Sequence, residues 1–260
     1  MKVDVNQLFE EFGRFPQVEA IALGGSRATG RNDEKSDYDV YIYITDSIDE
    51  KERQAVLSKY CKYMEIGNSF WELEDDVTLN DGIDMDIIYR DMKDFENMVS
   101  SVVTNCVAWN GYTTCMWHNL KTCKIIYDRD GRLQAAKDRF NVPYPKQLKK
   151  NIIDRNMNLL SEVMPAYKYQ IEKAAGRNDL VSVCHRTAAF MESYFDIIWA
   201  MNELTHPGEK RLVSLCQKQC KILPANFEAN INQLYADLFT NLDKVNEDVD
   251  AIIVELKKVV

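Results

Sequence analysis

Long apolar runs are missing from this sequence of 260 residues. No segment approaches the ~20 consecutive apolar residues that a helix needs to cross a bilayer. The N-terminal residues also lack the apolar stretch of a signal peptide, and the chain contains no internal repeat or low-complexity tract. We therefore expect a soluble, cytoplasmic protein that has no membrane partner.

Paired cysteine motifs are also absent. Seven cysteines are scattered through the chain, and none of them forms a C-x-x-C pair. An odd and scattered set predicts reduced thiols rather than a disulfide framework. Cys115, His118 and Cys123 come nearest to a metal cluster, but a structural zinc site usually takes four ligands in paired spacing. The pattern therefore favours thiols that pack in the core.

Basic residues are fewer than acidic ones: the 32 Lys and Arg and the 41 Asp and Glu give a net charge of −9. Phosphate groups of a nucleic acid are repelled by such a balance, because broad electrostatic attraction requires the opposite sign. The composition therefore argues against a nucleic-acid partner and favours a small-molecule acceptor or a cationic one. A local basic pocket remains compatible with it.

The first half of the sequence alternates helical and strand patterns. Apolar spacing predicts helices over residues 5–13, 49–63 and 91–103, and strands over 19–23, 37–44, 83–89 and 124–127. Such an order predicts an α/β (α+β) fold whose small mixed sheet of four or five strands is flanked by helices. We expect this catalytic domain to span residues 1–142.

The second half changes character after Pro143-Tyr144-Pro145. Nearly every later segment is compatible with a helix, and we expect helices over residues 146–161, 165–176, 179–203, 208–219 and 226–258, with a break inside the last. A helical bundle domain over residues 143–260 is the prediction.

The most informative stretch begins where the strand over 19–23 runs into Gly24-Gly25-Ser26-Arg27. Glycines let a backbone approach a ligand closely. The hydroxyl of Ser26 and adjacent amides could hold phosphate oxygens, as anion-binding nests do, and Arg27 could add positive charge. This turn is a candidate nucleotide-binding site.

Two carboxylates follow at the start of the next strand. Asp37 and Asp39 are two residues apart, so both side chains leave the same face of a strand, with Cα atoms roughly 6.6 Å apart. Such a pair repels unless a cation lies nearby, and Mg²⁺ suits because it takes oxygen ligands and bridges carboxylates to phosphates. The strand over 83–89 supplies a third carboxylate, Asp84 or Asp86. We favour Asp86 because it lies deeper in that strand.

The run G-G-S-R-A-T-G followed by S-D-Y-D resembles the signature of the DNA-polymerase-β-like nucleotidyltransferase superfamily. In the resemblance, the family's Gly and Ser match Gly25 and Ser26, its acidic pair matches Asp37 and Asp39, and its third carboxylate is best matched by Asp86. The likeness implies transfer of a nucleoside monophosphate from a nucleoside triphosphate (NTP) to a hydroxyl, with two Mg²⁺ ions bound by these three residues.

The helical half shows a second resemblance. The segments Gly176–Leu180, Asn202–Leu204 and His206–Arg211 resemble the DUF4037 family of that superfamily, which joins this catalytic domain to a helical bundle as kanamycin and lincosamide nucleotidyltransferases do. Lys210 follows Pro207-Gly208 at an expected helix start. It could reach a triphosphate, because helix N-termini and lysines both favour phosphate.

The expected activity is therefore Mg²⁺-dependent nucleotidyl transfer from an NTP such as ATP to a small-molecule hydroxyl, on a molecule that could resemble an antibiotic. Two alternatives stay open: transfer to a protein or RNA partner, and a nucleotide-binding module that has lost catalysis. The group that accepts the hydroxyl proton also stays open, between Asp86 and Glu192 of the helical half. His185 is more typical of a packed or surface histidine.

Overall fold

The computed structural model describes residues 3–30 and 33–260, which form two compact units. The first unit consists of the chain up to Ser100 together with Asn119–Val142. The second consists of Ser101–His118 and Pro143–Val260. The chain thus enters the second unit early, returns to the first, and enters the second again at Pro143.

A six-stranded sheet forms the centre of the first unit, in the order β3-β4-β5-β2-β1-β6. β2 and β5 pair in parallel, and the other neighbouring strands pair antiparallel. The mixed sheet predicted from the sequence is therefore confirmed. The strands are β1 (Val18–Leu23), β2 (Tyr38–Ile44), β3 (Cys61–Asn68), β4 (Leu73–Leu79), β5 (Asp84–Asp91) and β6 (Lys124–Asp128).

Strands β3 and β4 were not among the predicted elements. The helix expected over 49–63 ends at Leu57, as α3 (Glu50–Leu57), and the chain enters β3 at Cys61. The charged run from Asp49 to Arg53 gives this segment its helical pattern, with Asp49 capping α3 by accepting from the N–H of Lys51. Within β3 the exposed Tyr63 and Glu65 alternate with the partly buried Met64 and Ile66, which is the period of a strand.

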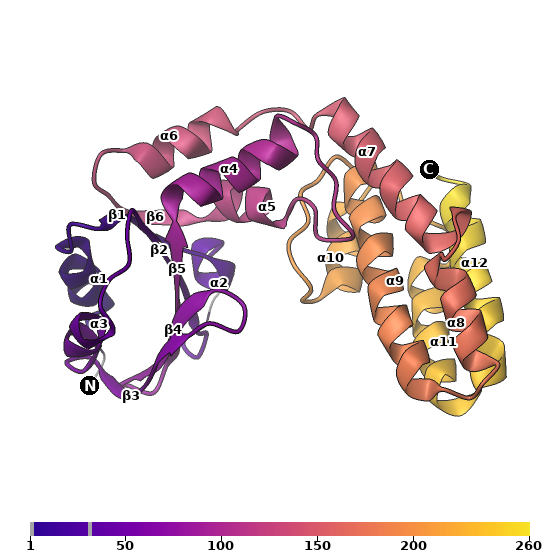
Figure 1. Cartoon of the computed structure of the whole chain (residues 1–260), viewed down its shortest axis with the longest axis horizontal. Coiled ribbons are helices and arrows are strands. Elements are labelled where there is room, and N and C mark those ends of the chain that lie inside the picture. Colours follow the sequence, from indigo (N-terminus) through magenta and orange to yellow (C-terminus); the bar gives the residue numbers. More distant parts are fainter. Residues whose placement is uncertain (1–2, 31–32) are drawn as a thin grey trace. The chain divides into compact units, whose positions relative to one another are not determined.

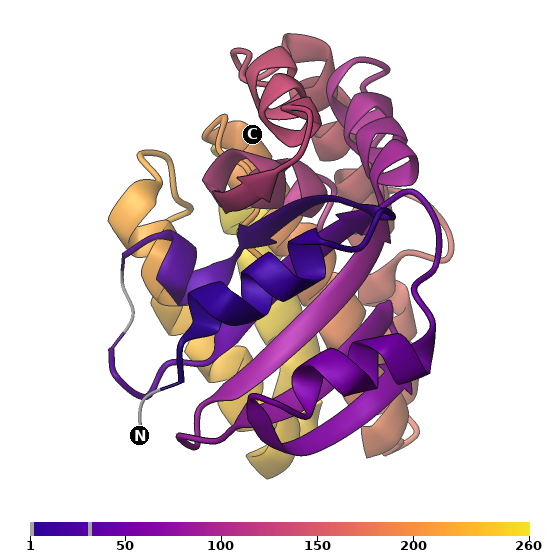
Figure 2. The same cartoon turned by 90° about the vertical axis from the view of Figure 1, so that its left-hand side faces the viewer.

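Helices α1 (Val5–Gly13) and α3 pack on one face of the sheet, which is hereafter the α1 face (Figures 1 and 2). Leu8, Phe9 and Phe12 of α1 share one hydrophobic core with alternate residues of the strands, among them Val40 and Met85. Their spacing of three and four residues puts them on one side of the helix. The sheet's other face carries Tyr43, whose ring lies 5.0 Å from that of Phe95 in α4. The remaining helices of this region are α2 (Gly25–Ala28), α4 (Met92–Val103), α5 (Cys115–Thr122) and α6 (Arg132–Arg139).

The second unit is helical, as the sequence predicts. The central helix is α9, whose residues from Ser193 to Met201 are all buried, so it is surrounded by its neighbours at this end. The break expected inside residues 226–258 falls after Thr240. The helix expected over 208–219 begins only at Leu212, because Arg211 adopts left-handed backbone angles. The helices are α7 (Lys146–Met157), α8 (Tyr167–Ala175), α9 (Leu180–Met201), α10 (Leu212–Gln219), α11 (Phe227–Thr240) and α12 (Val245–Lys257).

The segment 101–118 is fixed to the second unit by a buried polar network. Asp196 of α9 accepts hydrogen bonds from the N–H of Thr113 (3.1 Å), from its hydroxyl (2.6 Å) and from the amide of Asn156 (3.2 Å). The N–H of His206 donates to the hydroxyl of Thr114 at 2.8 Å. None of the helices in the described part of the chain has the length and apolar character that a membrane crossing requires.

Candidate active site

The glycine turn after β1 is joined directly to the start of β2. The N–H of Gly24 donates to the carbonyl of Asp39 at 2.8 Å. Gly25 has a φ of +54°, a conformation that favours glycine. A Cβ at Gly25 would lie 1.8 Å from Oδ2 of Asp39. The absence of a side chain at position 25 is therefore what allows the Asp39 carboxylate to lie against this turn.

Ser26 and Arg27 follow in the same turn but have different surroundings. The Oγ of Ser26 is buried and has no hydrogen-bond partner among the described residues. Arg27 is already engaged, because its Nε donates to the carbonyl of Asp37 at 2.8 Å and its Nη2 donates to that of Ser36. Its guanidinium lies 3.6 Å from the ring centre of Tyr38. In this structure Arg27 therefore holds the backbone that leads to Asp37.

The parallel pairing of β2 and β5 brings two of the three predicted carboxylates together. Asp39 and Asp86 are register partners, and both are half-buried. Their neighbours in sequence, such as Val40 and Met85, enter the core of the α1 face, so Asp39 and Asp86 leave the opposite face. Asp37 precedes β2 and is exposed. Asp84, the alternative third carboxylate, is exposed at the start of β5 and accepts from the hydroxyl of Thr78 at 2.8 Å.

The row of carboxylates formed by Asp39 and Asp86 continues across the sheet onto β4 and β3, two strands that the sequence did not predict. Asp76 of β4 is the register partner of Asp86, and Glu65 of β3 is the register partner of Asp76. Burial and the nearby carboxylates of Asp76 and Asp86 raise the pKa of Glu74. This face, with Asp39, Glu65, Glu74, Asp76 and Asp86, is hereafter the acidic face.

Oxygen ligands on the acidic face suit Mg²⁺, although the described residues contain no preformed group of three His, Cys, Asp or Glu placed to hold a metal. Mg²⁺ usually keeps several waters and takes one or two carboxylates together with substrate phosphates. A complete protein cage is therefore not required, and the donor chemistry of Asp39 and Asp86 fits such an ion.

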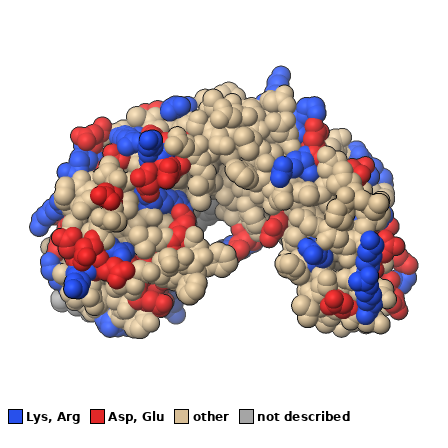
Figure 3. Space-filling view, viewed as in Figure 1, with Lys and Arg blue, Asp and Glu red and all other residues tan. Residues whose placement is uncertain are grey.

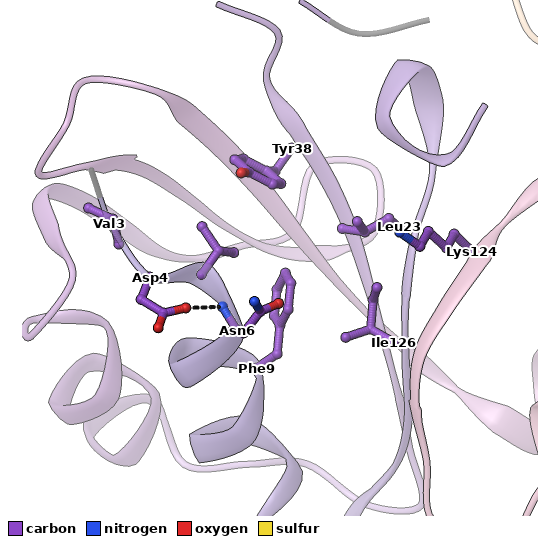
Figure 4. Close-up of a pocket in the computed structure, with 9 residues that line it drawn as sticks. Val3, Asp4, Asn6, Phe9, Leu23, Tyr38, Lys124 and Ile126 are labelled. Atoms are coloured by element: carbon purple, nitrogen blue, oxygen red, sulfur yellow. Dashed lines mark hydrogen bonds between the residues drawn. The ribbon is translucent and has the colours of Figure 1, made fainter. Parts of the chain in front are cut away.

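A cavity of about 420 Å³ lies on the opposite side of the sheet. Figure 4 shows Phe9, Leu23 and Ile126 at this cavity, with Tyr38 and Lys124 nearby. Leu23 and Phe9 belong to the core of the α1 face. The cavity is thus separated by the sheet from the carboxylates of Asp39 and Asp86.

The candidates in the helical half belong to the second unit. Lys210 is exposed and precedes α10, so the expected position inside the first turn of that helix is wrong. His185 is exposed on α9. Burial, followed by the charge of Glu209, raises the pKa of Glu192. Cys115 and Cys123 lie in different units, and the Cys115 Sγ is 3.5 Å from Nδ1 of His206.

Two family comparisons match separate parts of the chain. The family described as "Polymerase beta, Nucleotidyltransferase" matches residues 6–83, which include the glycine turn, Asp37 and Asp39 but end before Asp86. The family described as "Domain of unknown function (DUF4037)" matches residues 109–211. This second match begins inside the segment that the structure packs with the second unit. Comparison with curated protein sequences gives no match.

Solved structures of low identity were also found. A nucleotidyltransferase-like protein from Exiguobacterium sibiricum 255-15 is 9% identical, with 98% of this chain and 74% of that chain covered and a TM-score of 0.44. An aminoglycoside 6-adenyltransferase from Bacillus subtilis is 10% identical, with 97% and 86% covered and a TM-score of 0.32. A CCA-adding enzyme from Thermotoga maritima, complexed with tRNA, is 8% identical, with 98% and 79% covered and a TM-score of 0.26.

Those scores are too low to say anything about an acceptor, so the assignment depends on the family matches and on the residues they contain. The first match holds the turn Gly24-Gly25-Ser26 and both carboxylates at the start of β2. The chain thus carries one segment that is similar to polymerase-β-type nucleotidyltransferases, residues 6–83, and a second that is similar to DUF4037 domains, residues 109–211.

Proposed function

We propose that this protein transfers a nucleoside monophosphate from an NTP to a hydroxyl group of a small molecule. The observation that supports this most directly is the contact between the glycine turn and Asp39, one of the carboxylates expected to bind metal. Gly25 lies against Asp39, and Asp39 is the register partner of Asp86. A phosphate chain held at the turn would therefore lie next to both carboxylates.

Each residue of the proposed site has a role that follows from its chemistry. The Oγ of Ser26, which has no hydrogen-bond partner among the described residues, suits phosphate oxygens of the NTP together with the backbone of Gly24 and Gly25. Asp37, Asp39 and Asp86 would hold Mg²⁺, which when bound neutralises charge on the phosphates. Arg27 fixes the backbone before Asp37 and would set where that carboxylate lies. Lys210 of the second unit remains a candidate for contact with the triphosphate.

In the reaction, the acceptor oxygen forms a bond to the α-phosphorus while the bond from that phosphorus to the bridging oxygen of the β-phosphate breaks. Pyrophosphate leaves with the electron pair of the broken bond. The proton of the hydroxyl goes to a carboxylate, for which Asp86 and Glu192 are the candidates.

A small molecule is the preferred acceptor because the net negative charge of the chain gives no general attraction for nucleic acid. On the face seen in Figure 3, acidic and basic side chains are interspersed over the first unit. The net charge of −9 adds a general repulsion toward phosphate backbones.

A product screen tests this proposal. The protein is incubated with each NTP, Mg²⁺ and a small-molecule extract, and mass spectrometry searches for metabolites that have gained one nucleoside monophosphate. A parallel reaction contains protein and RNA instead. Products of the small-molecule reaction that vanish with Asp39→Asn support the proposal, whereas modification of the macromolecules alone contradicts it.

A further inference from the structure

The turn between β3 and β4 displays two adjacent aromatic side chains. Phe70 is 85% exposed and Trp71 is 90% exposed, the two highest fractions among the exposed large hydrophobic residues of the described chain. A single exposed apolar residue is ordinary, but two neighbouring rings offer a large apolar area that a ligand can cover. In Figure 1 this turn extends on the side of the sheet away from α1 and α3.

The turn is held in place at both ends. On the β3 side, the N–H of Phe70 donates to Oδ1 of Asn68, and Nδ2 of Asn68 donates to Oδ2 of Asp76, each at 3.1 Å. On the β4 side, Glu72 accepts two hydrogen bonds from the buried Arg90, both at 2.7 Å. A bidentate pair of this kind fixes orientation as well as distance. The aromatic pair is therefore presented by an anchored turn.

The anchors also connect the turn to the acidic face. Asp76, which Asn68 contacts, is the register partner of Asp86. Glu65 is the register partner of Asp76 on the next strand. None of the ion pairs found over residues 3–30 and 33–260 includes Glu65, Glu74 or Asp76. The surface between the aromatic pair and Asp86 is thus complementary to positive charge.

We propose that Phe70 and Trp71 form one wall of the acceptor site and select an acceptor built of rings that carry protonated amines. Its rings stack on the two aromatic side chains, its amines face Asp76 and Glu65, and its reacting hydroxyl lies toward the row of Asp39 and Asp86. The inference rests on the proposed nucleotidyl transfer and specifies the acceptor class. Aminosugar oligomers have this chemistry.

Binding can be measured without turnover by following the four tryptophan indole N–H signals of the full ¹⁵N-labelled chain, with the Trp71 signal assigned from Trp71→Phe. Three probes separate the contributions: a glucosamine trimer, cellotriose, which keeps the rings and lacks amines, and spermidine, which keeps the amines and lacks rings. Titrations at mildly acid pH keep the glucosamine amines protonated. We expect the trimer to shift the Trp71 signal and to bind at least about tenfold more tightly than either other probe.

Variants at the exposed Trp71 and at the half-buried Asp76 locate the binding. Trp71→Ala should weaken trimer binding at least about tenfold, and Asp76→Asn should weaken it several-fold and reduce its dependence on salt. Trp109→Ala, at a half-exposed tryptophan of the second unit, and Glu52→Gln, at an exposed carboxylate of α3, are the matched controls and should leave the affinity unchanged.

Binding of Mg²⁺ and ATP is measured on the same samples. If Mg²⁺ and ATP bind and the trimer does not, the acceptor assignment is overturned while the proposed function stands. Failure to bind Mg²⁺ and ATP in any sample counts against the proposed function itself. Equal affinity for cellotriose or for spermidine overturns the combined ring-and-amine assignment. Concentration-dependent association that Trp71→Ala abolishes, without trimer binding, would identify the aromatic pair as a contact between copies of the chain.

Discussion

Asp39 and Asp86 are register partners on β2 and β5, the one parallel pair in the described sheet. Neighbouring strands lie roughly 4.8 Å apart, so two carboxylates leaving the same face at this spacing repel when both are ionised. A divalent cation bound by both carboxylates would relieve this repulsion. The pairing therefore distinguishes Asp86 from Asp84, which lies at the strand start and contacts Thr78.

This distinction gives the first prediction. Asp39→Asn and Asp86→Asn should each lower Mg²⁺-dependent turnover by about 10³-fold or more, because a neutral amide cannot offset the charge of the metal. Asp84→Asn is the matched control on the same face of the same strand, and it should retain most of the activity. Rates would be measured with the acceptor found in the product screen. Circular dichroism would verify that each variant is folded.

The assignment of the third carboxylate would be wrong if Asp84→Asn lost activity and Asp86→Asn kept it. If all three variants remained active, carboxylate-bound metal would have no part in the reaction.

The second prediction concerns the contact between Gly25 and Asp39. Gly25→Ala should weaken binding of Mg²⁺ and ATP by at least about tenfold, because the new Cβ would have to displace the Asp39 carboxylate. Gly30→Ala is a matched control. Gly30 also has a positive φ, of +68°, but its Cβ would meet nothing within 4 Å. Calorimetric titration of both variants separates the effect of displacing the Asp39 carboxylate from the effect of backbone strain alone. If both variants lost the same affinity for Mg²⁺ and ATP, the contact between Gly25 and Asp39 would not account for the loss.

The third prediction concerns the buried hydroxyl of Ser26, which has no partner among the described residues. Ser26→Ala should weaken ATP binding by about 1.5–3 kcal/mol, the magnitude of one hydrogen bond to a charged group. Protein stability should change little, because no internal hydrogen bond to this Oγ is lost. Unaltered ATP affinity, measured by the same titration, would mean that the hydroxyl does not contact phosphate.

Periodic segments and the short motif were predictable from sequence because their information is local. The strand of Asp39, the strand of Asp86 and most helices of the second unit follow from apolar spacing. Register is not local, so the sequence suggests Asp86 only by its depth in a strand. The parallel pairing with β2 is what places it beside Asp39.

The outer part of the sheet could not be predicted, for an identifiable reason. The run Leu73-Glu74-Asp75-Asp76-Val77 does not alternate between apolar and polar residues, because Asp75 is on the buried side. It is accommodated there by Arg53 of α3 (2.7 Å) and by the hydroxyl of Tyr89 (2.8 Å). The sequence near Asp75 does not reveal that Arg53, which lies 22 residues away, is its partner. Residues 101–118 belong to the second unit for a similar reason, because they are held there by residues distant in sequence, chiefly Asp196.

The fourth prediction tests that buried pair. Arg53 and Asp75 are 2% and 0% exposed, so Arg53→Met would leave a buried carboxylate without its cation and should lower the free energy of unfolding by about 3–5 kcal/mol. Arg132→Met removes an arginine that is 36% exposed and pairs with Glu19 and Glu96, and it should cost about 1 kcal/mol or less. Urea unfolding measures both. Adding Asp75→Asn to Arg53→Met should recover part of the loss, and a further loss would contradict the explanation.

The fifth prediction follows from two buried groups of the second unit whose pKa values shift in opposite directions. Burial raises the pKa of Asp196 from 3.8 to about 7. The folded state then holds a proton that the unfolded state has released, so this group's stabilisation is lost as the pH rises from about 4 to about 7. Burial lowers the pKa of His206 from 6.5 to about 3. The folded state keeps this ring neutral, so its contribution is lost as the pH falls below about 6.5.

Between about pH 4 and pH 6.5 the two dependences oppose each other, and each should emerge when the other group is removed. In Asp196→Asn the melting temperature should rise with pH across this interval, because only the pH dependence from His206 remains. In His206→Asn the melting temperature should fall with pH, because only the pH dependence from Asp196 remains. The amide oxygen of this asparagine can accept from the N–H of Gly208 as Nδ1 does. Melting of the wild type and both variants, followed by tryptophan fluorescence over a pH series, measures the slopes. Parallel curves for all three proteins would show that neither group titrates differently in the folded and unfolded states. The docking of Thr113 and Thr114 onto α9 and His206 would then involve no net uptake or release of protons.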